Sequence, residues 1–128
     1  MKKNKRHIQY MKDMIASLTE GVGYAAEYEI LLQQNKEIDE KYSKLVMRGL
    51  ERTFEIAGEA ANRVSEEIQN KYKDILWRDM TDMRNVIIHE YDGVRERRLL
   101  KVAKEDVPAA LEALKKAIEQ EEQRLKNG

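Results

Sequence analysis

The sequence predicts an all-α protein, an up-and-down helical bundle of four main helices and one short one. Apolar residues recur at alternating intervals of three and four along most of the chain, which is the period of one helix face. No segment alternates apolar and polar residues in the way that a half-buried strand does. A length of 128 residues suits one hydrophobic core, and we expect a single domain over residues 1–128.

The composition excludes several classes of protein. With 24 basic and 24 acidic residues the net charge is zero, which argues against a broadly basic nucleic-acid binder. The absence of cysteine excludes a disulfide framework and any thiolate metal site. No apolar run approaches the roughly 18 residues of a membrane span, and the basic start lacks the apolar stretch of a signal peptide. The absence of cysteine leaves the compartment untested, although nothing suggests secretion. We expect a cytoplasmic protein with no membrane contact, no metal and no cofactor.

The first half of the chain predicts three helical pieces. The first stripe consists of Ile8, Met11, Ile15, Leu18 and Val22. Because glycine weakens helices, Gly21 and Gly23 predict a kink or break, with a short helical piece following from Tyr24 to about Gln33. The polar residues 35–39 predict a connection in which Asp39 caps the next helix.

The most regular stripe predicts a long helix over residues 39–72. Its members are Met47, Leu50, Phe54, Ala57, Ala61, Val64 and Ile68. Small residues gather at its middle, and we expect Gly58 to let a neighbouring helix come close. A core with one Phe and one Trp is modest, so we expect a homodimer that buries more of this helix.

Two further helices complete the expected bundle. The fourth helix is marked by Trp77, Met80, Met83, Ile87 and Tyr91. We expect Asp92 and Gly93 to stop it. The last helix is expected to begin with Asp106 as its cap and Pro108 in its first turn. Its apolar residues are Leu111, Leu114, Ile118 and Leu125.

Most catalytic templates are missing from the sequence. It contains no glycine-rich phosphate loop and no serine elbow, and its two histidines lie 82 positions apart, without zinc-ligand spacing. One segment stands out, Arg84-Asn85-Val86-Ile87-Ile88-His89-Glu90-Tyr91. On an ideal helix Arg84 lies about 40° and Tyr91 about 20° from Met80, on the core-facing side, while Asn85 and His89 share the opposite face. We expect Tyr91 on this basis to pack at the edge of the core.

The segment has two interpretations. In the structural one, Arg84 pairs with an acid of a neighbouring helix and His89 is merely exposed. In the functional one, Arg84 binds a phosphate and His89 moves a proton near neutral pH, as attack by an RNA 2′-hydroxyl requires. The two side chains point about 140° apart on a helix. They reach one phosphate only if the helix loosens before His89, which the β-branched run 86–88 would favour, or if two protomers contribute.

The pattern Arg84-x-x-x-x-His89-x-Tyr91, preceded by Trp77-Arg78-Asp79-Met80, resembles the signature of HepT-like proteins. These belong to the HEPN superfamily and are toxin components of prokaryotic toxin–antitoxin pairs. The Gly-Glu-Ala at residues 58–60 is similar to part of the family's long second helix. The resemblance covers roughly residues 5–125.

The resemblance implies a dimeric helical bundle with the Arg–His motifs at the seam, and a metal-independent endoribonuclease. It implies that Arg84 binds the scissile phosphate, that His89 is the general acid and base, and that Asn85 supports them. It also implies a partner, a minimal nucleotidyltransferase (MNT) antitoxin, which in some systems adenylylates the motif tyrosine, here Tyr91. An adenylyl group there would block a phosphate site by its bulk and charge.

Three points remain open from the sequence. The basic residues Arg95, Arg97 and Arg98 could bind an RNA backbone or, equally, an acidic partner. The chain could be a non-catalytic HEPN module that binds nucleotide or a partner nucleotidyltransferase. It could also be a helical interaction domain in which Arg84 and His89 are structural.

Overall fold

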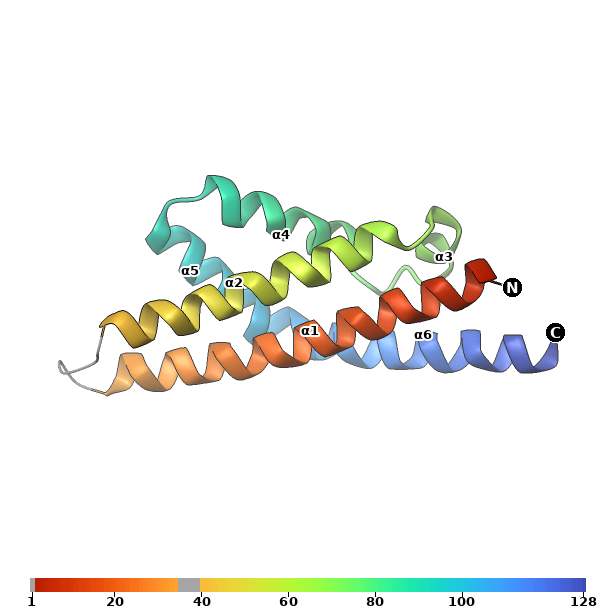
Figure 1. Cartoon of the computed structure of the whole chain (residues 1–128), viewed down its shortest axis with the longest axis horizontal. Helices are drawn as coiled ribbons and strands as arrows, with labels where there is room; N and C mark the ends of the chain where they lie inside the picture. The colour runs from red at the N-terminus through yellow and green to blue at the C-terminus, as the bar shows by residue number, and fades with distance from the viewer. Residues whose placement is uncertain (1, 35–39) are drawn as a thin grey trace.

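The computed structural model describes residues 2–34 and 40–128, and over these residues it contains helices and no strand (Figure 1). The elements are α1 (Lys2–Gln33), α2 (Glu40–Arg63), α3 (Glu66–Lys71), α4 (Trp77–His89), α5 (Asp92–Lys101), the π-helical turn η1 (Val102–Asp106) and α6 (Val107–Asn127). The predicted all-α bundle is confirmed. None of the described helices is long and apolar enough to cross a membrane.

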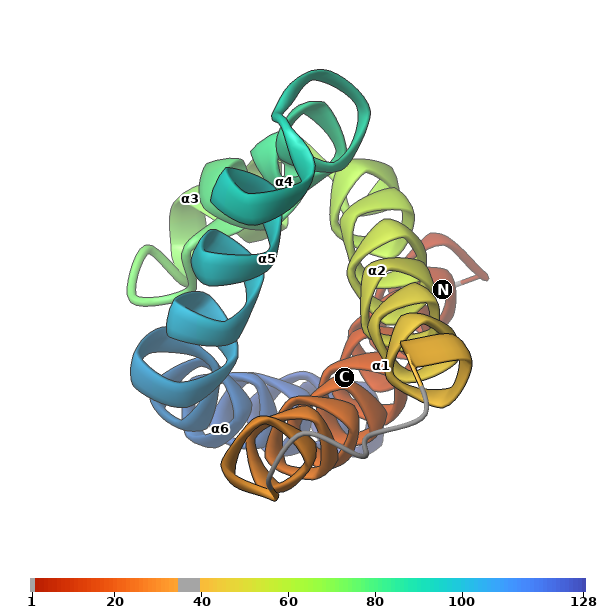
Figure 2. The same cartoon turned by 90° about the vertical axis from the view of Figure 1, so that its left-hand side faces the viewer.

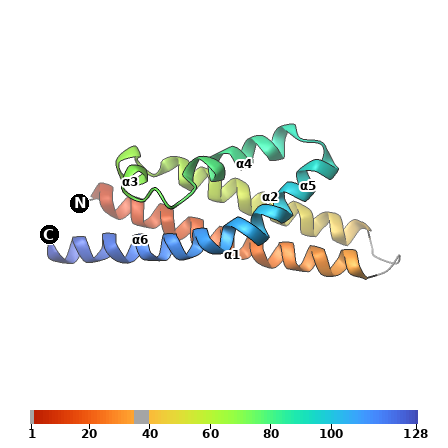
Figure 3. The same ribbon diagram turned by 180° about the vertical axis from the view of Figure 1, so that it is seen from behind.

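The bundle is built on a long antiparallel hairpin of α1 and α2. α4 packs on α2, and α6 returns along α1, so that the four long helices surround one interior (Figure 2). The chain turns between α4 and α5 at residues 90–91, which we call the α4–α5 corner. Seen from behind, α5, η1 and α6 follow one another from this corner to the C-terminus as one nearly continuous helix (Figure 3). Both chain ends lie at the end of the bundle away from this corner.

The core contains most residues of the predicted apolar stripes, together with Met14, Leu99 and Val107, which those stripes did not include. Its largest fully buried side chains are Phe54, Met11, Met14, Leu18, Leu50, Met80, Leu99, Leu114 and Val107. Every member of the stripe from Met47 to Ile68 is buried. Burial of such side chains provides most of the free energy that holds a bundle together.

The predicted break at Gly21 and Gly23 is wrong, because α1 continues to Gln33 and includes the short piece expected after it. A Cβ added at Gly21 would lie 2.7 Å from the hydroxyl of Thr53 on α2. The missing side chain therefore serves the close approach of two helices. Asp39 and the connection over residues 35–39 lie outside the described residues.

The predicted single helix over 39–72 is also wrong, since α2 ends at Arg63 and α3 is separate. Ser65 caps α3, and its hydroxyl accepts a hydrogen bond from the backbone N–H of Ile68 at 3.4 Å. Apolar spacing continues across the break because Val64 and Ile68 both remain in the core. Periodicity alone therefore could not reveal the boundary.

Asp92 and Gly93 begin a helix, whereas the sequence predicted that they stop one. α4 ends earlier because Glu90 and Tyr91 adopt extended backbone conformations. The predicted start of the last helix is confirmed, since α6 begins at Val107 with Asp106 at the N-cap position and Pro108 in its first turn. Asp106 makes no side-chain capping bond, because η1 already makes the chain helical there. A proline ring clashes with a regular helical carbonyl four residues back, and for Pro108 that residue lies in the wider π-helical turn.

Candidate active site

The Arg84–Tyr91 segment lies on the last turns of α4 and at the α4–α5 corner. α4 is anchored by four buried side chains, Trp77, Met80, Met83 and Val86. The indole of Trp77 also donates a hydrogen bond to the carbonyl of Tyr72 at 3.0 Å. With its core-facing side fixed in this way, the helix presents Arg84, Asn85 and His89 to solvent.

Arg84 lies at the surface beside α2, with its aliphatic stem on Gly58. A Cβ built at Gly58 would lie 3.3 Å from Cγ of Arg84 and 2.8 Å from the carbonyl oxygen of Met80. The expectation that Gly58 lets a helix come close is confirmed. Within the described part of the chain, the guanidinium has neither a hydrogen bond nor an ion pair. The alternative in which an acid of a neighbouring helix neutralises Arg84 is therefore wrong for these residues.

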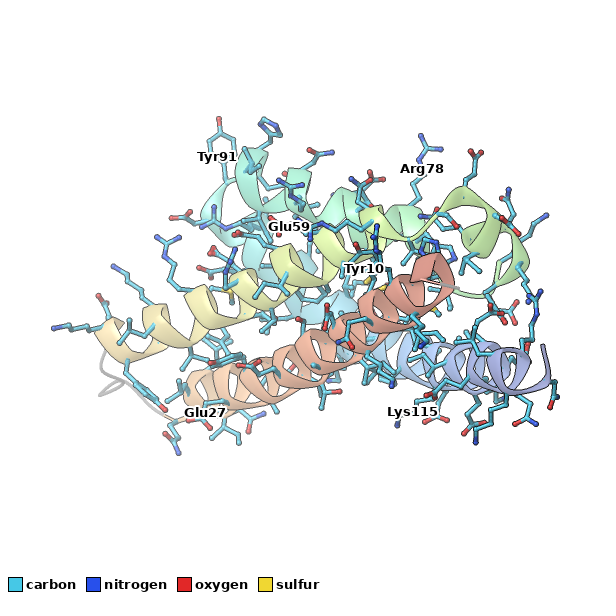
Figure 4. All side chains as sticks on the ribbon, turned by 45° about the vertical axis from the view of Figure 1, so that its right-hand side comes forward. Tyr10, Glu27, Glu59, Arg78, Tyr91 and Lys115 are labelled. Atoms are coloured by element: carbon cyan, nitrogen blue, oxygen red, sulfur yellow. The ribbon has the colours of Figure 1, made fainter. Side chains whose placement is uncertain are left out.

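Tyr91 points away from the bundle, as Figure 4 shows. Its side chain is 86% exposed, so the expectation of a residue at the core edge is wrong. The reason is the end of α4: the ideal-helix angle no longer applies once Glu90 leaves the helical conformation. Ile88, 65% exposed, adds an apolar side chain to the same solvent-facing region of the corner.

α4 remains a regular helix as far as His89. The N–H of Glu90 still donates to the carbonyl of Val86 at 3.0 Å, which is the normal bond four residues back. The loosening before His89 that would bring its imidazole round to Arg84 is therefore absent. The two side chains stay on different sides of one helix, about 140° apart.

The three arginines of α5 differ in their surroundings. Arg95 has only 13% of its side chain exposed, and its Nε lies 3.1 Å from the carboxylate of Glu51. Arg97 is exposed, and Arg98 is 54% exposed with its guanidinium 3.3 Å from Glu90. Arg97 and Arg98 thus face solvent next to the corner, whereas Arg95 belongs to the interior.

The motif lies outside five hollows of the described surface. These hollows, from about 240 to about 560 Å³, are lined by other residues than Arg84, Asn85, His89 and Tyr91. A phosphate bound to one protomer would therefore be contacted from one side only.

Comparison with known proteins identifies the family. The family model described as "Ribonuclease HepT-like" matches residues 8–117. The chain belongs to the HepT-like ribonuclease family.

Curated relatives of this HepT-like chain are ribonucleases by name. "Probable ribonuclease HepT" of Thermococcus cleftensis is 34% identical over 100 residues, 77% of this chain and 86% of the relative. A "Putative RNase" of Caldanaerobacter subterraneus subsp. tengcongensis is 30% identical, over 74% of this chain and 88% of the relative. A "Putative RNase" of Methanocaldococcus jannaschii is 35% identical over 66 residues, which are 52% of this chain and 61% of the relative. No solved structure matches the chain.

The HepT-like corner contains one buried acid that sequence reasoning missed. Glu51 of α2 is only 4% exposed and contacts Arg95. Its position seven residues before Gly58 puts it two turns away on the same face of α2, which packs on α4. That spacing was visible in the sequence. Among the described residues, no group of three His, Asp or Glu side chains could hold a metal ion.

Proposed function

We propose that this HepT-like chain is the toxin of a prokaryotic toxin–antitoxin pair, a metal-independent endoribonuclease whose site is built from Arg84 and His89 at a dimer seam. The observation that supports it best is that both side chains are exposed on α4 with no partner among the described residues. Both groups are therefore available to a bound phosphate. Because the chain belongs to a ribonuclease family, we propose that this phosphate is part of an RNA backbone.

The chemistry proposed is transfer of the phosphodiester to the neighbouring 2′-oxygen. Arg84 binds the non-bridging oxygens with its fork of donors, which becomes stronger as negative charge develops on them. His89 accepts the proton of the 2′-hydroxyl as that oxygen attacks phosphorus, and returns it to the departing 5′-oxygen. Asn85, on the His89 side of the helix one turn away, supports the phosphate with its amide. The products are a 2′,3′-cyclic phosphate and a free 5′-hydroxyl.

The geometry favours a site shared by two protomers. Arg84 and His89 diverge on a regular helix, and the motif lines none of the five hollows described above. A second α4 packed against the first would bring His89 of one protomer to Arg84 of the other. Ile88 offers an apolar contact for such a seam because it is exposed between them.

RNA beyond the scissile bond would contact α5. Arg97 and Arg98 are proposed for this role, since each is exposed next to the corner and can neutralise a phosphate. We do not propose Arg95 as an RNA contact, although the sequence predicted it as one, because its side chain is only 13% exposed and pairs with Glu51.

The exposed hydroxyl of Tyr91 is proposed as the point of control by a nucleotidyltransferase antitoxin. The phenolic oxygen would attack the α-phosphate of ATP and displace pyrophosphate, leaving an adenylyl group on the tyrosine. A phosphodiester there would compete with RNA for the positive charge of the corner.

The deciding experiment measures cleavage of a mixed RNA by purified protein in EDTA. Wild type should cleave and leave 2′,3′-cyclic phosphate ends, whereas the His89→Ala and Arg84→Ala variants should lose the activity. Arg78→Ala is the matched control, because Arg78 is exposed on the same helix and points away from the corner (Figure 4). Equal or absent cleavage in wild type and His89→Ala would sink the ribonuclease proposal and leave the non-catalytic HEPN module.

A further inference from the structure

One arginine inside the α4–α5 corner contacts three elements at once. Nε of Arg95 lies 3.1 Å from Oε1 of Glu51 on α2, and Nη1 donates to the carbonyl of Ile87 on α4 at 3.4 Å. Nη2 lies 2.7 Å from the carboxylate of Asp92 at the start of α5. The Nη1 and Nη2 contacts are hydrogen bonds, whereas the buried Nε meets Glu51 in an ion pair without an aligned hydrogen bond. The planar guanidinium allows arginine to make these contacts together. The corner is thus fastened to α2 through one guanidinium.

The contact with Ile87 gives a hydrogen-bond donor to a carbonyl oxygen at the end of α4. The last carbonyls of a helix have no partner within it, and they form the negative end of its dipole. Arg95 supplies both an N–H and a positive charge at this point. Because Ile87 belongs to the final turn of α4, the turn held in place is the one that presents His89.

Glu51 is the group that keeps Arg95 inside. Its side chain is 5% exposed, and a carboxylate buried to this degree is stable only when it is paired. A second cation, Arg48, lies 3.3 Å away but is 72% exposed, so it can turn into solvent at little cost. Asp92, the other acid near Arg95, is 85% exposed. The buried pair is therefore Glu51 with Arg95.

We propose that Glu51 is a positioning residue: through Arg95 it fixes the last turn of α4 and with it the direction of the His89 imidazole. Without the Glu51 charge, Arg95 follows Asp92 toward solvent, and the carbonyl of Ile87 loses its donor. The consequence for RNA cleavage rests on the proposed function. Displacement of a catalytic group by about 1 Å can lower a rate about 100-fold.

The test uses Glu51→Gln in the full chain and follows the two histidines by NMR of their imidazole groups. His89 reports on the corner, and His7 serves as an internal reference. His7 accepts a hydrogen bond from the N–H of Ser65 at 3.4 Å, and Ser65 lies 14 residues beyond Glu51. The signals of His89 should move or broaden while those of His7 stay in place. RNA cleavage should fall about 100-fold.

Two glutamates provide matched controls for the same substitution. Glu55, one turn along α2, pairs with exposed Arg52 at 3.3 Å, and Glu121 is another buried carboxylate, on α6. Neither Glu55→Gln nor Glu121→Gln should move the His89 signals. An equal change in Glu121→Gln would show that loss of any buried charge suffices, and would overturn the proposal.

A second variant decides the matter if Glu51→Gln does not fold. Arg95→Lys keeps a cation beside Glu51 but loses the fork that reaches Ile87 and Asp92, so the His89 signals should again move. Unchanged His89 signals in whichever of the two variants folds would overturn the proposal. If wild type cleaves no RNA, the proposed function fails alone, because the imidazole spectra report on positioning without any activity.

Discussion

Two glutamates are buried among the residues that the structure describes, and each pairs with a cation from another helix. Glu51 contacts Arg95, and Glu121 contacts Lys71 at 2.7 Å and accepts a hydrogen bond from the hydroxyl of Tyr72. Burial would raise the pKa of the Glu121 carboxyl, but the hydrogen bonds from Lys71 and Tyr72 and the charge of Lys71 outweigh it and hold the pKa below its ordinary value of 4.5. In return, burial and Glu121 raise the pKa of Tyr72.

The lowered pKa of Glu121 predicts a pH-dependent stability. A carboxyl whose pKa is lower in the folded chain stabilises the fold above its unfolded pKa, and this contribution is lost as the pH falls through the folded pKa. We expect Glu121→Gln to lower the free energy of unfolding at pH 7 by about 2 kcal/mol. Urea unfolding of both proteins should show the difference shrinking below about pH 4. A difference that stays constant down to about pH 2 would contradict the linkage.

The side chain of Tyr91 is 86% exposed and has no hydrogen-bond or ion-pair partner among the described residues. We therefore expect Tyr91→Phe to change the free energy of unfolding by less than about 0.5 kcal/mol. Incubation of wild type with an adjacent nucleotidyltransferase and ATP–Mg should add adenylyl mass, and Tyr91→Phe should remain unmodified. Intact mass spectrometry measures both. An adduct that survives in Tyr91→Phe would exclude this tyrosine as the acceptor.

At the level of the helices, the sequence predicted which residues are buried better than where each helix begins and ends. Most residues of the stripes on α1, α2, α4 and α6 lie in the core, because a helix has to bury its apolar face whatever its neighbours are. The boundaries were missed where tertiary contacts overrule local preference. Gly21 serves a helix contact, and Arg95 supports the early end of α4 from another helix. Neither effect can be read from neighbouring residues in the chain.

In the candidate site, too, the sequence predicted what depends on helix periodicity and missed what depends on tertiary contacts. Spacing alone placed Asn85 and His89 correctly on the solvent-facing side of α4, whereas Arg84, expected on the core-facing side, is exposed. What could not be placed was Tyr91, because its position depends on two residues leaving the helical conformation. The burial of Arg95 also required knowledge of which acid faces α5 from α2.

Glycine at two helical positions gives a matched test of helix contact. A Cβ at Gly58 would lie 2.8 Å from the backbone oxygen of Met80, so Gly58→Ala should push α4 away and cost about 1–3 kcal/mol of stability. A Cβ at Gly23 would meet nothing within 4 Å. Gly23→Ala should therefore stabilise α1 by about 0.5–1 kcal/mol. Thermal unfolding distinguishes the two signs, and a stabilising Gly58→Ala would contradict the close packing of α2 and α4.

For the whole molecule, zero net charge hides an uneven distribution. Residues 13–35 of the sequence carry acids and no Lys or Arg, whereas residues 95–104 carry five basic residues and one acid. The exposed Arg97 and Arg98 lie on this basic segment beside the α4–α5 corner. A neutral protein can therefore offer RNA a local positive surface, and a twofold dimer through α4 would double it along one seam.

The proposed site, shared by two protomers, predicts a recovery of activity that only a dimer could show. Arg84→Ala and His89→Ala should each be inactive, but in a mixed dimer one site combines Arg84 of one protomer with His89 of its partner. After denaturation and joint refolding in equal amounts, about half of the dimers are mixed and one of their two sites is intact. The mixture should regain about a quarter of wild-type RNA cleavage. If both residues acted within one protomer, every site would carry a lesion and no activity would return. Ile88→Asp should prevent recovery by separating the protomers, because it introduces a charge into the proposed seam while leaving the core of each chain untouched.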